Sequence, residues 1–145
     1  MRTLILFAAT CVAIGITLSS CASTNGRGWS TNCSDGGWAS VPISGRIEYD
    51  LLYEDVVSLV SKRFEIEMLT KESGYIRTKW DYRFATDGEV SNTYRTRITI
   101  KLSPQRNRIE VKSEAEKLRG KSWIQGCDTR LLETMKQDLQ GISGY

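Results

Sequence analysis

YRTRITIKL, residues 94–102, alternates between two kinds of side chain along its whole length. Tyrosine, threonine, isoleucine and leucine occupy one set of positions, and arginine, threonine and lysine occupy the other. Because successive side chains of a β-strand point to opposite faces of the sheet, this segment predicts a strand with one apolar face and one charged face. Such strands are typical of an antiparallel sheet that is covered on one side only.

The segments on both sides of residues 94–102 alternate in the same way. Further strands are predicted at residues 64–68, 76–84 and 108–116. Turn sequences separate them, and Asp87-Gly88 between two alternating segments is a strong signal for a β-hairpin. The sequence therefore predicts three or four antiparallel strands that follow one another as a meander.

Helical periodicity flanks the predicted strands. Apolar residues recur at helical spacing over 52–64, after Asp50 as a candidate N-cap, and over 131–139, after Asp128 as another. Two apolar helix faces and one apolar sheet face are buried together when the helices pack on one side of the sheet. We therefore predict an α+β fold for residues 47–145. It is a two-layer, helix-grip-like domain in the order helix, three or four antiparallel strands, helix.

The N-terminus has the pattern of an export signal. Met1-Arg2-Thr3 carries a positive charge, and the apolar run from Leu4 to Leu18 is 15 residues long. A membrane-spanning helix needs about 20 apolar residues, whereas a signal peptide needs fewer. A short membrane anchor or a buried helix is the alternative interpretation of this run.

Leu18-Ser19-Ser20-Cys21 follows the apolar run and resembles the lipobox of bacterial lipoproteins. The resemblance implies that residues 1–20 are removed as a signal peptide and that the Cys21 thiol receives the lipid, which anchors the chain to the membrane. Ala22 stands where an aspartate retains such proteins at the inner membrane in enterobacteria. The resemblance therefore implies the periplasmic face of the outer membrane.

The remaining cysteines fit an oxidising compartment. Cys11 lies in the predicted signal peptide and Cys21 carries the predicted lipid, so Cys33 and Cys127 remain as a pair. We predict a disulfide between them. Two cysteines without a histidine form a poor zinc site, so no metal is expected. Serine, glycine and asparagine dominate residues 21–46, which predicts a flexible tether between lipid and domain.

The composition of the chain excludes several functions. The 145 residues contain no histidine, which removes serine–histidine and cysteine–histidine catalysis and histidine-ligated metals. Lys and Arg number 20 against 17 Asp and Glu, and the resulting formal net charge of +3 does not indicate a nucleic-acid-binding protein. The sequence shows no phosphate-binding loop or nucleophile elbow. No cofactor is expected.

The order of predicted elements resembles the helix-grip domains of outer-membrane assembly lipoproteins of the BamC type. The resemblance is carried by Tyr53-Glu54-Asp55-Val56-Val57 in the first helix, by Glu72-Ser73-Gly74-Tyr75-Ile76-Arg77-Thr78 at the start of a long strand, and by the strand over residues 94–102. It implies a single helix-grip domain that takes part in the assembly of an envelope complex.

A basic cluster is the candidate docking surface for an acidic partner, which could be lipid head groups, lipopolysaccharide phosphates or another envelope protein. Its residues, which lie on the charged side of two predicted neighbouring strands, are Arg77, Lys79, Arg83, Arg95 and Arg97. Such a surface would attract an acidic partner. The alternative is a solvated face on which opposite charges pair across strands.

Trp80, Tyr82 and Tyr94 fall on the predicted inward face of the strands. Core packing is the expected role of such aromatic side chains, and the alternative is a cleft between helix and sheet that holds an apolar ligand. The sequence thus predicts a non-enzymatic lipoprotein that serves as a structural or assembly component of a cell-envelope complex. A periplasmic module that binds a lipid or a small apolar ligand is the other possibility.

Overall fold

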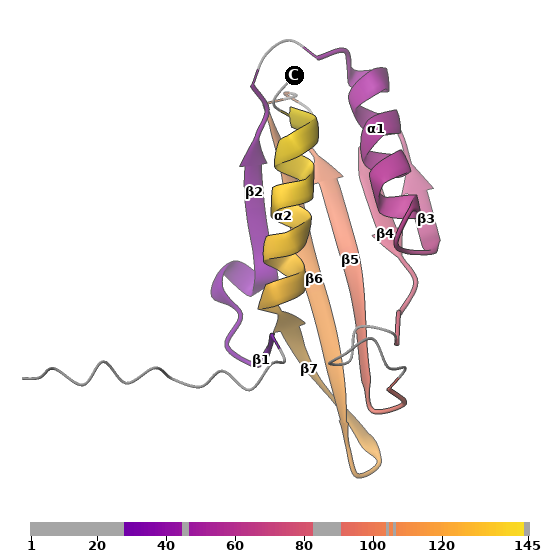
Figure 1. Ribbon diagram of the computed structural model, residues 1–145, viewed down its shortest axis with the longest axis vertical. Coiled ribbons are helices and arrows are strands. Elements are labelled where there is room, and N and C mark those ends of the chain that lie inside the picture. The colour runs from indigo at the N-terminus through magenta and orange to yellow at the C-terminus, as the bar shows by residue number, and fades with distance from the viewer. Residues whose placement is uncertain (1–27, 45–46, 83–90, 104, 106, 144–145) are drawn as a thin grey trace, which may run out of the picture.

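Figure 1 shows a computed structural model of the protein, in which residues 28–44, 47–82, 91–103, 105 and 107–143 are described. The predicted signal peptide, Cys21 and Arg83 lie outside the described residues. Within these residues, no helix is long and apolar enough to cross a membrane.

The secondary structure begins with three short elements, and the longest strand and the longest helix lie in the C-terminal half of the chain. The elements are β1 (Trp29–Ser30), the 3-10 helix η1 (Ser34–Gly37), β2 (Trp38–Pro42), α1 (Tyr49–Ser61), β3 (Ile66–Thr70), β4 (Tyr75–Thr78), β5 (Tyr94–Leu102), β6 (Arg108–Arg119), β7 (Ser122–Asp128) and α2 (Thr129–Ser143).

Strand β6 is the centre of the sheet. On one edge it pairs with β5 along the length of β5, and the strand order continues through β4 to β3. On the other edge, β2 pairs with residues 108–112 of β6 and β7 pairs with residues 115–119, so two short strands share that edge end to end. β1 extends the sheet beyond β7.

The predicted fold class is wrong. Among the described residues the chain forms an antiparallel sheet of seven strands, so strands dominate and the predicted order of helix, three or four strands, helix does not describe it. One missed strand is β7, in a segment for which the sequence analysis predicts no strand. Its side chains do not alternate between apolar and charged types, so periodicity gives no signal for it.

The N-terminal segment also differs from the prediction. Residues 29–42, expected within the flexible tether of residues 21–46, contribute β1 and β2 to the sheet. These strands are 2 and 5 residues long, and each pairs along one edge only. Strands this short carry too few side chains to show a period of two, and their polar residues suit an exposed edge.

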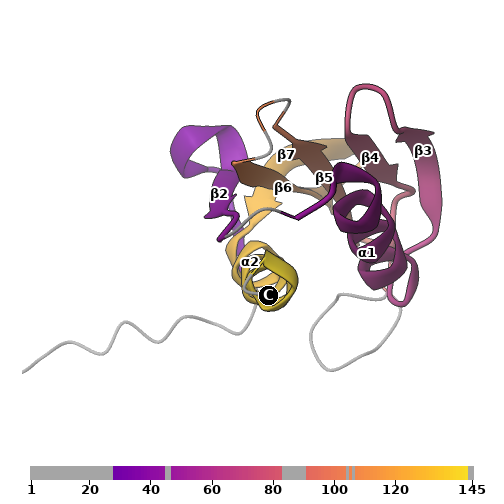
Figure 2. The same ribbon diagram turned by 90° about the horizontal axis from the view of Figure 1, so that it is seen from above.

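Helices α1 and α2 lie side by side on one face of the sheet, and the opposite face is not covered by a helix (Figures 1 and 2). Between the helices and the sheet lies one apolar core. Its fully buried side chains include Val41, Leu52, Val56, Val60, Ile76, Ile98, Ile100, Ile109, Val111, Met135 and Leu139. Hence the apolar faces of both helices are buried in the core. We call the face opposite α1 and α2 the outer face.

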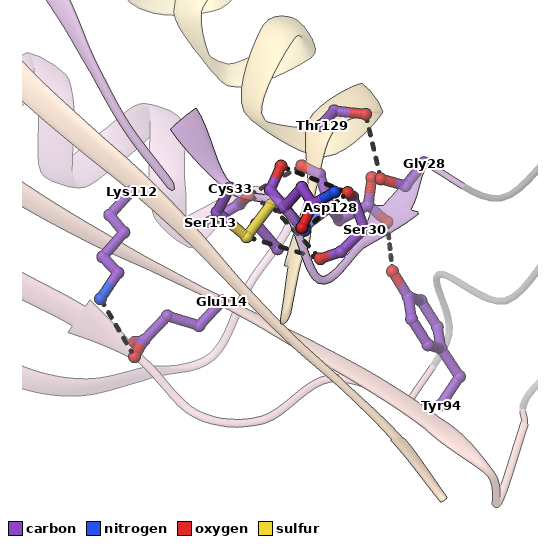
Figure 3. Close-up of a disulfide and its surroundings, with 11 residues drawn as sticks. Gly28, Ser30, Cys33, Tyr94, Lys112, Ser113, Glu114, Asp128 and Thr129 are labelled. Carbon is purple, nitrogen blue, oxygen red and sulfur yellow. Dashed lines mark hydrogen bonds and ion pairs between the residues drawn. A yellow bond between two sulfur atoms is a disulfide. The ribbon is translucent and has the colours of Figure 1, made fainter. Parts of the chain in front are cut away.

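Asp128 connects the end of β7 to the start of α2 (Figure 3). One carboxylate oxygen accepts the backbone N–H of Leu131 at 2.9 Å, which caps α2 as predicted. The other accepts the hydroxyl of Tyr94 at 2.6 Å. The Ser113 hydroxyl donates to the Asp128 carbonyl at 2.7 Å and accepts its N–H at 3.2 Å. α1 differs, because its N-cap is Glu48, without a side-chain hydrogen bond, and not the predicted Asp50.

The structure contains the predicted disulfide, which joins Cys33 to Cys127 at a Cα–Cα distance of 5.8 Å. It fixes the segment between β1 and η1 to the end of β7. Nearby, the carbonyl of Gly28 accepts the backbone N–H of Thr129 at 2.8 Å and its hydroxyl at 3.0 Å. A Cβ atom on Gly28 would stand 2.5 Å from Asp128 Oδ1, so only glycine allows this approach.

Replacing Tyr94 with phenylalanine removes the hydroxyl that donates to Asp128. Because the acceptor is a buried carboxylate oxygen, we expect the free energy of unfolding to fall by about 1–3 kcal/mol. Urea denaturation of the oxidised protein measures this change. Tyr75→Phe is the matched control, since Tyr75 is half-buried on β4 and its hydroxyl makes no hydrogen bond with a described residue. Equal, small losses in both variants would contradict the role of Tyr94.

Candidate functional site

The outer face carries pairs of opposite charges between β5 and β6. The register places Arg95 opposite Glu116 and Arg97 opposite Glu114. Each arginine donates its Nε–H to the facing carboxylate at 2.7 Å. Lys112, which neighbours Glu114 on the same face, lies 3.7 Å from that carboxylate. Charges of both signs therefore alternate along the middle of the outer face.

The members of the predicted basic cluster are paired with carboxylates where the structure describes them. Arg77 donates to Glu67 at 3.0 Å, and Lys79 contacts Glu65. Arg95 and Arg97 form the pairs given above, and Arg83 lies outside the described residues. The described members of the cluster therefore have little excess positive charge. This geometry matches the alternative that the sequence left open, in which opposite charges pair across strands.

Trp80 and Tyr82 lie on the outer face and not on the predicted inward face. In the register between the strands, Arg77 lies opposite Thr99. Four residues later Asp81 lies opposite Thr96, which is only three residues from Thr99, so the chain after β4 contains one extra residue. A one-residue slip moves the following side chains to the other face of the sheet. Trp80 consequently stands beside Arg97. Tyr94 lies inside as predicted and is 3% exposed.

Aromatic rings and arginines form one cluster on the outer face. The Arg95 guanidinium lies between two indole rings, 4.7 Å from the centroid of Trp80 and 4.3 Å from that of Trp123. It also donates to the Tyr82 hydroxyl at 3.2 Å. The Arg97 guanidinium lies 4.4 Å from the Trp80 ring. We call these five residues the tryptophan–arginine cluster. Stacking of this kind stabilises the cations in place by about 0.5–1 kcal/mol per contact at exposed sites.

A second aromatic site lies at the β2 side of the outer face. The Trp38 ring has Lys101 at 4.9 Å and Lys112 at 5.8 Å. Sequence reasoning missed both Trp38 and Trp123 as outer-face residues, because it assigned them to a tether and a loop. Recognising them requires knowledge of the strands that pair with β6, and their own short segments do not supply it.

A cleft of about 270 Å³ adjoins the tryptophan–arginine cluster. It opens where β2 and β7 leave residues 113 and 114 of β6 without a paired strand on that edge. Part of its lining is formed by Trp80, Arg97, Lys112, Glu114, Glu116 and Gln125. The cleft thus offers an aromatic ring, cations, carboxylates and an amide. These groups suit the binding of polar and aromatic side chains of another protein.

Arg97 and Glu114 at the cleft stabilise each other's ionised forms. Burial acts to raise the pKa of Glu114, but the hydrogen bond from Arg97 and the charges of Arg97 and Lys112 outweigh it and lower the pKa. The hydrogen bond to Glu114 raises the pKa of Arg97. Neither group therefore exchanges protons near neutral pH. Among the described residues, no group of three Cys, Asp or Glu side chains is placed to hold a metal ion.

A scan against models of known protein families finds no match to this chain, and a search of curated proteins finds no significant relative.

Glu114 makes the stability of the protein sensitive to acid. Its pKa is below the ordinary value of 4.5, so the unfolded chain binds this proton more readily than the folded protein. The stabilisation is complete above pH 4.5 and is lost as the pH falls through the lower folded pKa. We expect urea midpoints of the wild type to fall below that pH more steeply than those of Glu114→Gln.

Arg97→Gln is the matched second variant, because it removes the group that chiefly lowers the pKa of Glu114. It should flatten the same part of the pH profile. The same slope in the wild type and in both variants would rule out this origin of the acid sensitivity.

Proposed function

We propose that this protein is a non-enzymatic lipoprotein, anchored through Cys21 to the periplasmic face of the outer membrane. In this proposal it serves as a structural or assembly component of a cell-envelope protein complex. Its partner is a protein that docks on the outer face. The observation that carries the proposal is the tryptophan–arginine cluster, which occupies a sheet face that neither helix covers.

The composition of the outer face supports a protein partner. Tryptophan, tyrosine and arginine are the residues that most often contribute binding energy at protein interfaces. Trp80 and Trp123 are only partly buried, so each ring retains surface for contact with another chain. Their stacking on Arg95 holds them in fixed positions, which lowers the entropy lost on binding.

The charge pairs also bear on the chemistry of the partner. Arg95 and Arg97 already contact carboxylates, so an acidic surface is not needed to neutralise them. A partner that presents apolar and hydrogen-bonding groups to the rings and the cleft is the better match. This replaces the simple attraction of an acidic partner that the cluster's sequence suggests.

The core gives no support to a ligand held between helices and sheet. Leu52 and Val56 of α1 and Ile98 of β5 would line such a site, yet they are 0–1% exposed and belong to one packed cluster. Within the described residues, side chains of the protein itself fill this space. We therefore retain the structural and assembly role.

The anchor is tested by replacing Cys21 with serine. If Cys21 is the acylated residue, the variant cannot form the thioether to the lipid, so we expect uncleaved precursor and no incorporation of labelled palmitate. Metabolic labelling followed by immunoprecipitation measures this outcome. Cys11→Ser is the matched control, because Cys11 lies in the predicted signal peptide, and it should label like the wild type. Persistent labelling of Cys21→Ser would overturn the proposed anchor.

The docking surface is tested by the double variant Trp80→Ala, Trp123→Ala. Chemical cross-linking in intact envelopes, followed by affinity isolation and quantitative mass spectrometry, measures which proteins are bound. Because buried aromatic anchors each contribute about 2 kcal/mol or more at an interface, we expect at least an approximately tenfold loss of the cross-linked partner. The matched control removes exposed apolar side chains away from the outer face, as Leu51→Ala, Leu69→Ala.

Both double variants must first melt as folded, oxidised proteins. Equal recovery of the same partner with the wild type and both variants would place the interface away from the outer face and overturn this part of the proposal.

A further inference from the structure

The hairpin between β6 and β7 carries positive charge that no carboxylate of a described residue neutralises. We call the end of this hairpin, residues 117–122, the hairpin tip. It contains Lys117, Arg119 and Lys121. Gly120 makes the turn with φ of 62°. Among the described residues none of these cations forms an ion pair, in contrast to Arg95 and Arg97 farther along the same sheet. The arginines in the middle of the outer face are thus paired, whereas the three cations of the hairpin tip have no ion pair with a described residue.

Trp29 and Arg130 lie next to the hairpin tip. The Trp29 ring is 5.6 Å from the Lys117 ammonium and 5.9 Å from the Arg119 guanidinium. Arg130 lies at the start of α2, next to Gly28. The two residues are so close that a Cβ atom added to Gly28 would lie 2.8 Å from the Arg130 Cβ. Arg130 likewise has no ion pair with a described residue. The basic side chains and the half-buried indole ring therefore belong to one end of the domain.

Figure 1 shows this arrangement along the long axis of the molecule. β1 and the β6–β7 hairpin lie toward one end, and the first turn of α1 lies at the other. At that other end, Lys71 is 3.2 Å from the carboxylate of Asp50 and 3.9 Å from that of Glu54. Lys101, which also lies toward that end, has no ion pair with a described residue but faces the Trp38 ring. Most of the cations without an ion pair to a described residue therefore lie at the end where the N-terminal strand enters the sheet.

The chain length places this basic end near the anchor. Gly28 follows Cys21 by seven residues. Even a fully extended chain spans at most about 3.3–3.6 Å per residue, so this connection reaches no farther than about 25 Å. A lipid on Cys21 would therefore bring the basic end toward the bilayer before any other part of the domain. This step rests on the anchor proposed above.

We propose that the hairpin tip, with Trp29 and Arg130, docks on a membrane surface of anionic phospholipid headgroups and thereby orients the domain. Unpaired lysines and arginines each strengthen binding to such a surface by roughly fivefold. Indole rings favour the depth of the headgroups, and the half-buried Trp29 ring would contact them with its exposed part, since its Nε1–H is buried in the domain. With the tip on the membrane, the strands β5 and β6 point away from the bilayer, and the outer face is open to a partner from the side.

Vesicle binding of the unacylated chain tests this docking separately from the anchor. The chain from residue 21 with Cys21→Ser contains every described strand and helix and the disulfide. We expect it to sediment with vesicles of phosphatidylglycerol and phosphatidylcholine, but not with vesicles of phosphatidylcholine alone. The affinity should fall as salt rises, because the screening length is only about 10 Å at 0.1 M.

Charge removal at two ends of the sheet provides the matched comparison. The tip variant is Lys117→Gln, Arg119→Gln, Lys121→Gln. The control variant is Lys71→Gln, Lys101→Gln, Arg108→Gln, and its three residues lie at the end of the sheet away from the hairpin tip. Both lose the same net charge. The tip variant should bind anionic vesicles roughly 100-fold more weakly, and the control variant should lose far less.

Equal weakening of the tip and control variants would mean that the whole protein charge, and not the hairpin tip, drives binding. That result, or the absence of binding to anionic vesicles at low salt, would overturn the membrane-docking proposal. Palmitate labelling of Cys21 would remain valid in either case, so the two proposals fail independently.

Discussion

The second edge of β6 is the constraint on which this structure depends. A strand of 12 residues at the centre of a sheet must satisfy the backbone N–H and C=O groups on both its edges. β5 pairs with one edge, but no single strand pairs with the whole of the other. β2 and β7 divide that edge, and where they meet Ser113 bonds to Asp128 and the Cys33–Cys127 disulfide joins the segments. The same division leaves the cleft beside Trp80.

How far the sequence predicts the fold depends on where each segment pairs. The strand over residues 94–102 has the predicted bounds, because it is paired on both edges and has one buried face, which imposes a strict period of two. Asp128 caps α2 as predicted, since capping depends on a local spacing. The sequence analysis did not predict β2 and β7 as strands. Their pairing with β6 is a tertiary contact, and their own side chains do not alternate over a sufficient length. The fold class was wrong for this reason.

The candidate site shows the same limit at the level of single residues. The alternation correctly assigns Arg95 and Arg97 to one face of β5, but the carboxylates opposite them follow from the register with β6. Trp80 lies on the other face of the sheet than predicted because one extra residue precedes Asp81. No local residue pattern indicates this shift. The disulfide was predictable from a different kind of reasoning. Once the lipobox resemblance assigns Cys21, only Cys33 and Cys127 remain to pair, whatever the fold between them.

Pairing of the cations divides the surface into two kinds of binding region. Where Arg95 and Arg97 lie against carboxylates and indole rings, their fields cancel within a few ångströms, and the outer face can act only through direct contact. At the hairpin tip, Lys117 and Arg119 face the Trp29 ring but no carboxylate of a described residue, so their field extends over a screening length and acts before contact. In the proposed function, the first arrangement provides a specific fit and the second provides orientation. A protein anchored as we propose needs both, because a specific face is useful only when it points toward its partner.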